Sequence, residues 1–175
     1  MPDFQAQAAA YAAALSDFFA KYELPPEWFA APDHLAYKCA DSTEFEAILW
    51  NVKSISKHLS YIELNNRRLA AAELKEPLKV SGFGEVDWLE IMEPRPERVG
   101  SDVIGLEHME FYFPDFASIR RTLEEKVIAY KMEENPSHVW VNIVINDHGQ
   151  ELKLNNGRLG EVVAREVAEG HATVV

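Results

Sequence analysis

One order of elements occurs twice along this chain of 175 residues: a strand, a helix and then three strands. Polar and apolar residues alternate in the expected strands, whereas apolar residues recur every three or four positions in the expected helices. The first copy places its strands at 33–39, 58–64, 67–74 and 85–93, and the second at 106–113, 127–132, 138–145 and 150–154. The sequence therefore predicts an α+β fold with two βαβββ modules.

Two helical segments flank the modules. Residues 3–22 place apolar side chains on one helical face, and residues 158–169 are expected to form a short final helix. We expect one compact domain that consists of an N-terminal helical extension (1–32), a first module (33–96), a second module (97–156) and a C-terminal helix and tail (157–175).

The two faces of each expected strand differ in character, because successive side chains point to opposite sides. One face is apolar and needs the amphipathic helices to cover it. The opposite faces carry polar side chains and would together line a concave surface shared by the two modules. Four potential metal ligands fall on that second face: His34, Glu90, His108 and Glu151.

These four residues have the chemistry of a divalent metal site. Imidazole nitrogens and carboxylate oxygens bind Zn, Ni, Mn, Co and Fe, and the sequence leaves the identity of the ion open. A lone histidine on a strand is more often solvated, but two histidines and two glutamates at similar places in a repeat favour a common role. Glu110 lies on the same face as His108 and is a further candidate ligand or acid/base. Glu93 competes with Glu90 only if the strand register slips.

Charge and cysteine content narrow the classes of partner. The net charge is −12, whereas nucleic acids and anionic membranes attract basic surfaces. Cys39 is the single cysteine, so no internal disulfide forms, and its place on an apolar strand face predicts a core residue. The alanine-rich start lacks the positive region of a signal peptide, and no stretch is long enough to span a bilayer. We expect a cytoplasmic protein with small-molecule partners and leave the number of subunits open.

The chain resembles the vicinal oxygen chelate superfamily, which includes glyoxalase I, methylmalonyl-CoA epimerase and extradiol dioxygenases. The similarity covers about residues 33–156 and is carried by WLEIMEP, GLEHMEF and DHGQELKL. Within the superfamily the chain is most similar to the YecM-like group of candidate metalloproteins, through DHLAYKC, NNRRLAAAELKEP, EHMEFYF and the leading helix. The resemblance implies a cup-shaped sheet of two paired modules. It also places metal ligands on the first and last strand of each module, at His34, Glu90, His108 and Glu151.

Such a site implies a divalent-metal-dependent enzyme that acts on an oxygen-rich small molecule. The ion would act as a Lewis acid, and Glu90 or Glu110 would move a proton, which favours isomerase, epimerase or lyase chemistry. Lys38, Arg68 and Lys153 are candidates to neutralise an anionic substrate.

Three alternatives stay open. His34, His108 and Glu151 alone would form the two-histidine, one-carboxylate set that suits Fe(II) and oxygen activation, so a dioxygenase-like oxidoreductase is one of them. A small-molecule binding module without catalysis is another. The third is a partner-binding protein in which the site is degenerate.

Overall fold

A computed structural model describes residues 2–64, 66–99, 103–134 and 139–175, and it confirms the predicted order of elements. The first module consists of β1 (Pro32–Lys38), α2 (Ser42–Ile55), β2 (Ser56–Leu64), β3 (Arg67–Val80) and β4 (Gly84–Met92). The second consists of β5 (Gly105–Tyr112), α3 (Phe116–Glu125), β6 (Lys131–Glu134), β7 (Val139–Val144) and β8 (Glu151–Asn155). The remaining elements are α1 (Phe4–Tyr22), η1 (Pro26–Phe29), η2 (Pro96–Arg98), α4 (Leu159–Ala168) and β9 (Thr173–Val174).

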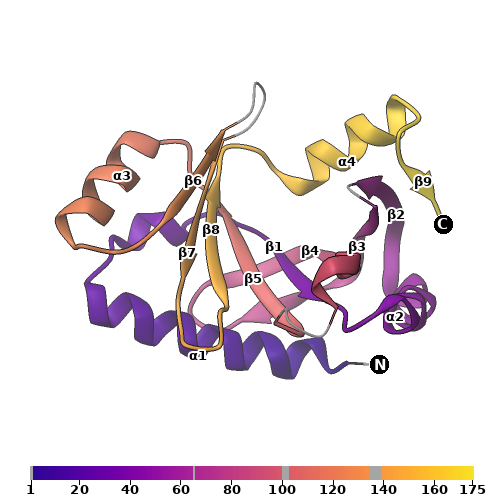
Figure 1. The fold of residues 1–175 in the computed structure, drawn as a ribbon, viewed down its shortest axis with the longest axis horizontal. Coiled ribbons are helices and arrows are strands. Elements are labelled where there is room, and N and C mark those ends of the chain that lie inside the picture. Colours follow the sequence, from indigo (N-terminus) through magenta and orange to yellow (C-terminus); the bar gives the residue numbers. More distant parts are fainter. Residues whose placement is uncertain (1, 65, 100–102, 135–138) are drawn as a thin grey trace.

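The strands of both modules form one mixed sheet with the order β6-β7-β8-β5-β1-β4-β3-β2-β9. The first strands of the two modules, β1 and β5, are antiparallel neighbours at its centre. Each of them pairs in parallel with the last strand of its own module, β4 or β8. The two modules therefore have an approximate twofold relation about the β1–β5 pair. Figure 1 shows α1 on one side of this curved sheet and α4 on the other.

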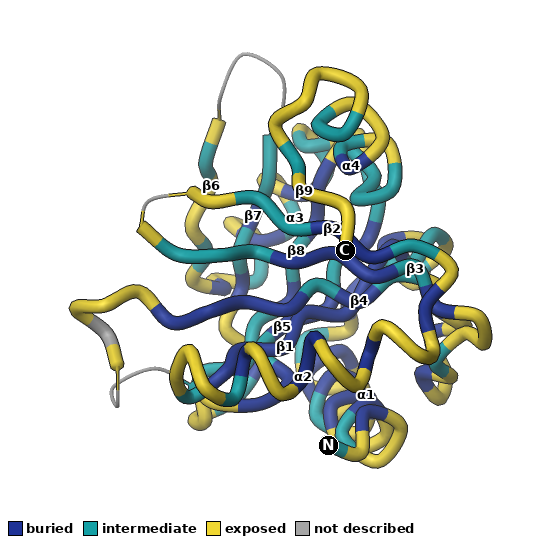
Figure 2. The backbone as a smooth tube through the Cα atoms, turned by 90° about the vertical axis from the view of Figure 1, so that its right-hand side faces the viewer, coloured by how far each residue is buried: buried dark blue, intermediate teal, exposed yellow. Residues whose placement is uncertain are grey.

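The hydrophobic core lies between the sheet and helices α1 to α3, as strand alternation predicted. Leu35 of β1 and Phe111 of β5 are fully buried in it, as is Tyr11 of α1. The Tyr11 hydroxyl donates to the Glu151 carbonyl at 2.5 Å and accepts from the Met109 N–H at 3.1 Å, which fixes α1 on the β5–β8 pair. Figure 2 shows buried residues along the central strands and exposed residues on the outer turns of α1.

The predicted strand at 127–132 is wrong over residues 127–130. Val127 has a φ of 56°, in the left-handed region, and its N–H bonds to the Glu124 carbonyl in the turn that follows α3. The strand therefore begins only at Lys131. The end of helix α3 determines the backbone at these residues.

Two other features of the sheet differ from expectation. Strand β3 continues beyond residue 74 to Val80, and the short strand β9, which was not predicted, pairs with β2. Asn65, which lies between the predicted strands at 58–64 and 67–74, and His138, which was expected to begin a strand, lie outside the described residues. Within the described ranges no helix is both long enough and apolar enough to cross a membrane.

Candidate metal centre

The central strand pair brings the two predicted histidines together. His34 on β1 is the register partner of Glu110 on β5, and His108 is the partner of Ala36. The two imidazole centroids are 6.0 Å apart. His34 is 3% exposed and His108 is fully buried, so both rings belong to the interior of the concave face.

Two carboxylates approach the Nε2 atoms of these histidines. Oε1 of Glu110 lies 3.5 Å from Nε2 of His108 and 3.8 Å from Nε2 of His34. Oε2 of Glu90 lies 3.8 Å from Nε2 of His108. His34, Glu90 and His108 each offer one donor atom, and these three atoms lie within 4.8 Å of one another. This spacing allows one divalent ion to contact all three residues after small side-chain movements.

Two β-bulges hold the histidine rings in place. The register between β1 and β5 skips Asp33 at one position and Glu107 at another. Strict alternation would point each acid to the face opposite the histidine that follows it. A bulge lets the acid and its histidine point to the same side. Oδ2 of Asp33 lies 2.7 Å from Nδ1 of His34, and Oε2 of Glu107 lies 3.2 Å from Nδ1 of His108. Because each Nδ1 has a carboxylate partner, each Nε2 faces the centre as a potential ligand.

The two supporting acids have different further partners. Oδ2 of Asp33 also accepts the backbone N–H of Leu159 at 2.9 Å, in the first turn of α4. Glu107 instead accepts a hydrogen bond from the ammonium group of Lys38. Lys38, a candidate to neutralise a substrate, is thus buried and paired with the carboxylate that holds His108.

The electrostatic environment favours positive charge at His34. Burial alone would lower the pKa of His34, but the surrounding negative charges raise it to about 9. These charges belong to Glu110, Asp33 and Glu90. A divalent ion bound at Nε2 would displace the proton that this environment stabilises, so metal binding should release a proton.

Glu110 is held in its ionised form. Burial acts to raise its pKa, but the positive charges of His34, His108 and Lys153 keep it well below its ordinary value. The amide of Asn155 also donates to the Glu110 carboxylate. Glu110 is therefore a fixed carboxylate beside the two histidines, which fits both roles that the sequence left open.

The donor set fits a divalent ion. Nε2 of His108 is buried and has no hydrogen-bond partner among the described residues. A buried polar atom without a partner is costly, and a metal ion is one way to satisfy an imidazole nitrogen. Two imidazoles and one or two carboxylates around this atom are the ligands of zinc and of other first-row divalent ions.

Glu151 lies outside this group. It is the register partner of His108, whereas Glu90 is the partner of Ala36, two residues beyond His34. The position equivalent to Glu90 in the second module is therefore Lys153, the partner of Glu110. Among the described residues, the potential ligand groups with donor atoms within 4.8 Å do not include Glu151. Its role as a metal ligand stays a prediction.

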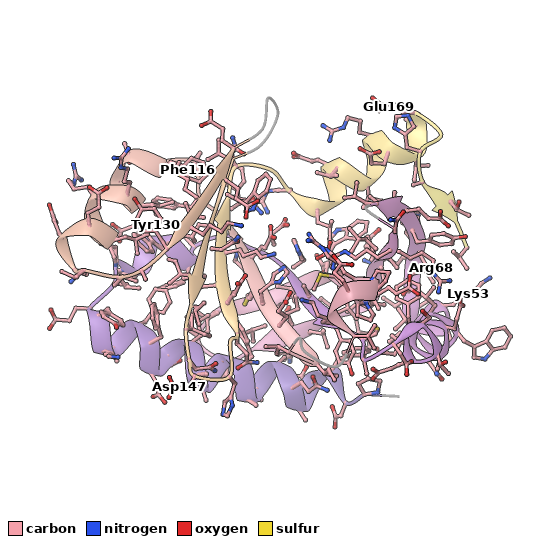
Figure 3. The ribbon with its side chains drawn as sticks, viewed as in Figure 1. Lys53, Arg68, Phe116, Tyr130, Asp147 and Glu169 are labelled. Carbon is pink, nitrogen blue, oxygen red and sulfur yellow. The ribbon has the colours of Figure 1, made fainter. Side chains whose placement is uncertain are left out.

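A cleft of about 590 Å³ opens over the centre. His34, Glu90 and Glu110 line its base, α4 contributes one wall, and Lys153, Arg67 and Arg165 bring positive charge to it. Figure 3 shows side chains from α4 and from the strands directed into the space between them, with Glu169 at the far end of the helix.

Arg68 and Glu93 form a separate pair. Nε and Nη2 of Arg68 donate to the two oxygens of Glu93 at 3.1 and 3.0 Å, and the guanidinium stacks on the Phe45 ring. Neither residue lines the cleft. Arg68 is thus engaged in packing α2 on the sheet (Figure 3), and Glu93 does not take the place of Glu90.

A family model described as YecM protein matches residues 2–164. The chain belongs to the YecM family. This confirms the resemblance noted in the sequence. A solved structure described as "Structural Genomics, Protein EC4020" shares its fold, with a TM-score of 0.73, 20% identity, and coverage of 94% of this chain and 91% of that chain. A search of curated proteins gives no match.

Less similar structures also align with this YecM-family chain. Methylmalonyl-CoA epimerase from Mycobacterium tuberculosis gives a TM-score of 0.49 at 18% identity, over 77% of this chain and 91% of that chain. A variant of 4-hydroxymandelate synthase from Streptomyces coelicolor gives 0.46 at 15% identity, over 78% of this chain and 56% of that chain.

Sequence reasoning missed the two supporting acids of this YecM-family centre. The available signal was an acidic residue directly before each histidine, at Asp33 and Glu107. Alternation excluded them, because it takes no account of bulges. Two histidines that were not predicted as metal ligands have other partners. His58 bonds to Ser60 at 3.0 Å, and His171 is close to Glu166 at the end of α4.

Proposed function

We propose that this chain is a metal-dependent enzyme of the vicinal oxygen chelate type. His34, Glu90 and His108 would hold one divalent ion (Zn, Ni, Mn, Co or Fe), and the cleft would bind an oxygen-rich small molecule. The observation that carries the proposal is the buried Nε2 of His108, which has no hydrogen-bond partner in the described part of the chain and faces carboxylates, while Nδ1 of the same ring is held by Glu107.

The ion would supply Lewis-acid polarisation of substrate oxygens. The proton transfer would belong to Glu110, which lines the cleft and accepts a hydrogen bond from the amide of Asn155. Lys153 lies 3.8 Å from the same carboxylate and adds positive charge to the cleft. Residues of α4 line one side of the cleft. This arrangement supports isomerase, epimerase or lyase chemistry.

One alternative has a specific observation in its favour. Two histidines and one carboxylate, here His34, His108 and Glu90, also form the ligand set of Fe(II) oxygenases. Iron as the resident ion, together with oxygen consumption in the presence of substrate, would select this alternative.

Elemental mass spectrometry on the untagged chain tests the proposal. We expect about one divalent ion per chain in the wild type, and none in the His34→Ala/His108→Ala double variant. His58→Ala, which removes a histidine from β2 outside the centre, should keep the ion. If the wild type contains no ion, and gains none on incubation with Zn, Ni, Mn, Co or Fe(II), the proposed function is refuted.

A further inference from the structure

On the side of the first module, the concave face carries small and mostly apolar side chains. From Glu90 outward, the register partners on β3 and β2 are Ala71 and Ser60, both short side chains. Val162 and Val163 of α4 lie over them. A gap remains between these short side chains and the helix, and Ile62 and Leu69 of the same strands also line it.

This gap is a pocket of about 100 Å³ that is lined mainly by apolar side chains. An apolar cavity of about 150 Å³ holds one benzene molecule, so this pocket has room for about four carbon atoms. Glu90 and Val162 line both the pocket and the main cleft, so the two spaces adjoin directly beside the candidate metal centre.

The opposite side of the centre is charged. Lys153 stands at the position equivalent to Glu90, and its side chain lies partly exposed in the cleft with Nζ 3.8 Å from Glu110. The next register partner outward, Asn142, has an Oδ1 atom that is buried without a hydrogen-bond partner among the described residues. A divalent ion between the carboxylates of Glu90 and Glu110 would balance their charge. The ammonium group of Lys153 could then pair with an anionic ligand.

We infer that the cleft takes a short-chain organic acid with an oxygen on the carbon next to its carboxylate, a 2-hydroxy or 2-oxo acid. The carboxylate lies toward Lys153, and an aliphatic chain of about four carbons lies toward the pocket between Ala71 and α4. This inference rests on the proposed function, because the ion at His34, Glu90 and His108 would bind the two oxygens. It adds the class of substrate.

Calorimetric titration of the metal-loaded chain with a series of 2-hydroxy acids tests this inference. We expect the affinity to rise about fourfold per added methylene from glycolate to 2-hydroxyhexanoate, and to rise no further for 2-hydroxydecanoate. Ala71→Leu should abolish the dependence on chain length. Lys153→Gln should weaken the binding of every acid by about tenfold or more.

Two controls and one second variant complete the design. Ala10→Leu on the exposed side of α1 and Arg120→Gln on α3 should bind all the acids as the wild type does. Val162→Phe narrows the same pocket from the helix, and it replaces Ala71→Leu if that variant does not fold.

The metal content of every sample is measured first, so that failure of the two proposals can be told apart. If the ion binds but the acids show no dependence on chain length, or Lys153→Gln binds them unchanged, the substrate class is overturned and the metal centre stands. If no ion binds, the proposed function and this inference, which rests on it, are both overturned.

Discussion

Replacement of Asp33 by asparagine is a sharp test of how the candidate centre is held together. The carboxylate is 7% exposed, and its Oδ2 serves both Nδ1 of His34 at 2.7 Å and the N–H of Leu159 at 2.9 Å. The asparagine oxygen can accept both bonds only if its NH₂ group faces the guanidinium of Arg158, which lies 3.9 Å from Oδ1. Two donors would then face each other.

The expected loss follows from these two bonds. A hydrogen bond to a charged group contributes about 1.5–3 kcal/mol and a neutral one about 0.5–1.5 kcal/mol, so each bond loses about 1 kcal/mol with the charge. We therefore expect Asp33→Asn to lower the free energy of unfolding by about 2 kcal/mol. Because His34 also loses its orienting partner, the affinity for the divalent ion should fall about 10- to 100-fold.

Urea denaturation of the metal-free chain and competition with a chromophoric chelator measure the two effects. Glu107→Gln is the matched control, since Glu107 supports His108 in the same way but contacts Lys38 rather than α4. Both variants should lose metal affinity, but only Asp33→Asn should speed amide hydrogen exchange in α4. A free energy of unfolding within about 0.5 kcal/mol of the wild type, with unchanged metal affinity, would refute this account of Asp33.

Three further predictions concern other residues. Arg68 holds the pKa of Glu93 at about 2, below the ordinary value of 4.5, so the stability from this pair is present above pH 4.5 and is lost as the pH falls toward 2. Glu93→Gln should therefore reduce the loss of thermal stability over that acidic range, and an unchanged profile would contradict the pairing. Burial raises the pKa of the Cys39 thiol to about 12, so Ellman's reagent should label it only after unfolding. In chelator competition, Glu90→Gln should weaken metal binding more than Glu151→Gln does, and the reverse order would restore Glu151 as the ligand.

Strand alternation was enough to predict the faces of the sheet. His34, Glu90 and His108 were expected on one face because the apolar residues of the same strands fall on the opposite face, and the structure brings their donor atoms together. The same rule placed Leu35 and Phe111 in the core. Periodicity of this kind depends only on the local backbone, so the sequence contains it.

The register between strands could not be predicted from the sequence. Glu90 and Glu151 looked equivalent because each lies on the last strand of its module, but the pairing offsets them by two residues and makes Lys153 the counterpart of Glu90. Hydrogen bonding between strands that are distant in the sequence determines this offset, and two bulges in the β1–β5 pairing turn Asp33 and Glu107 toward the histidines. Local pattern carries no information about either.

The bond between Asp33 and Leu159 joins residues that are 126 positions apart in the chain. Contacts of such separation close a large loop and form late, because the entropy of closure is lost before the contact stabilises the chain. The two modules can therefore pair their strands before α4 docks on the bulge of β1. The capacity to bind an ion should then appear in a later kinetic phase of refolding than the sheet itself. A folding intermediate would contain the paired strands but not the complete metal centre.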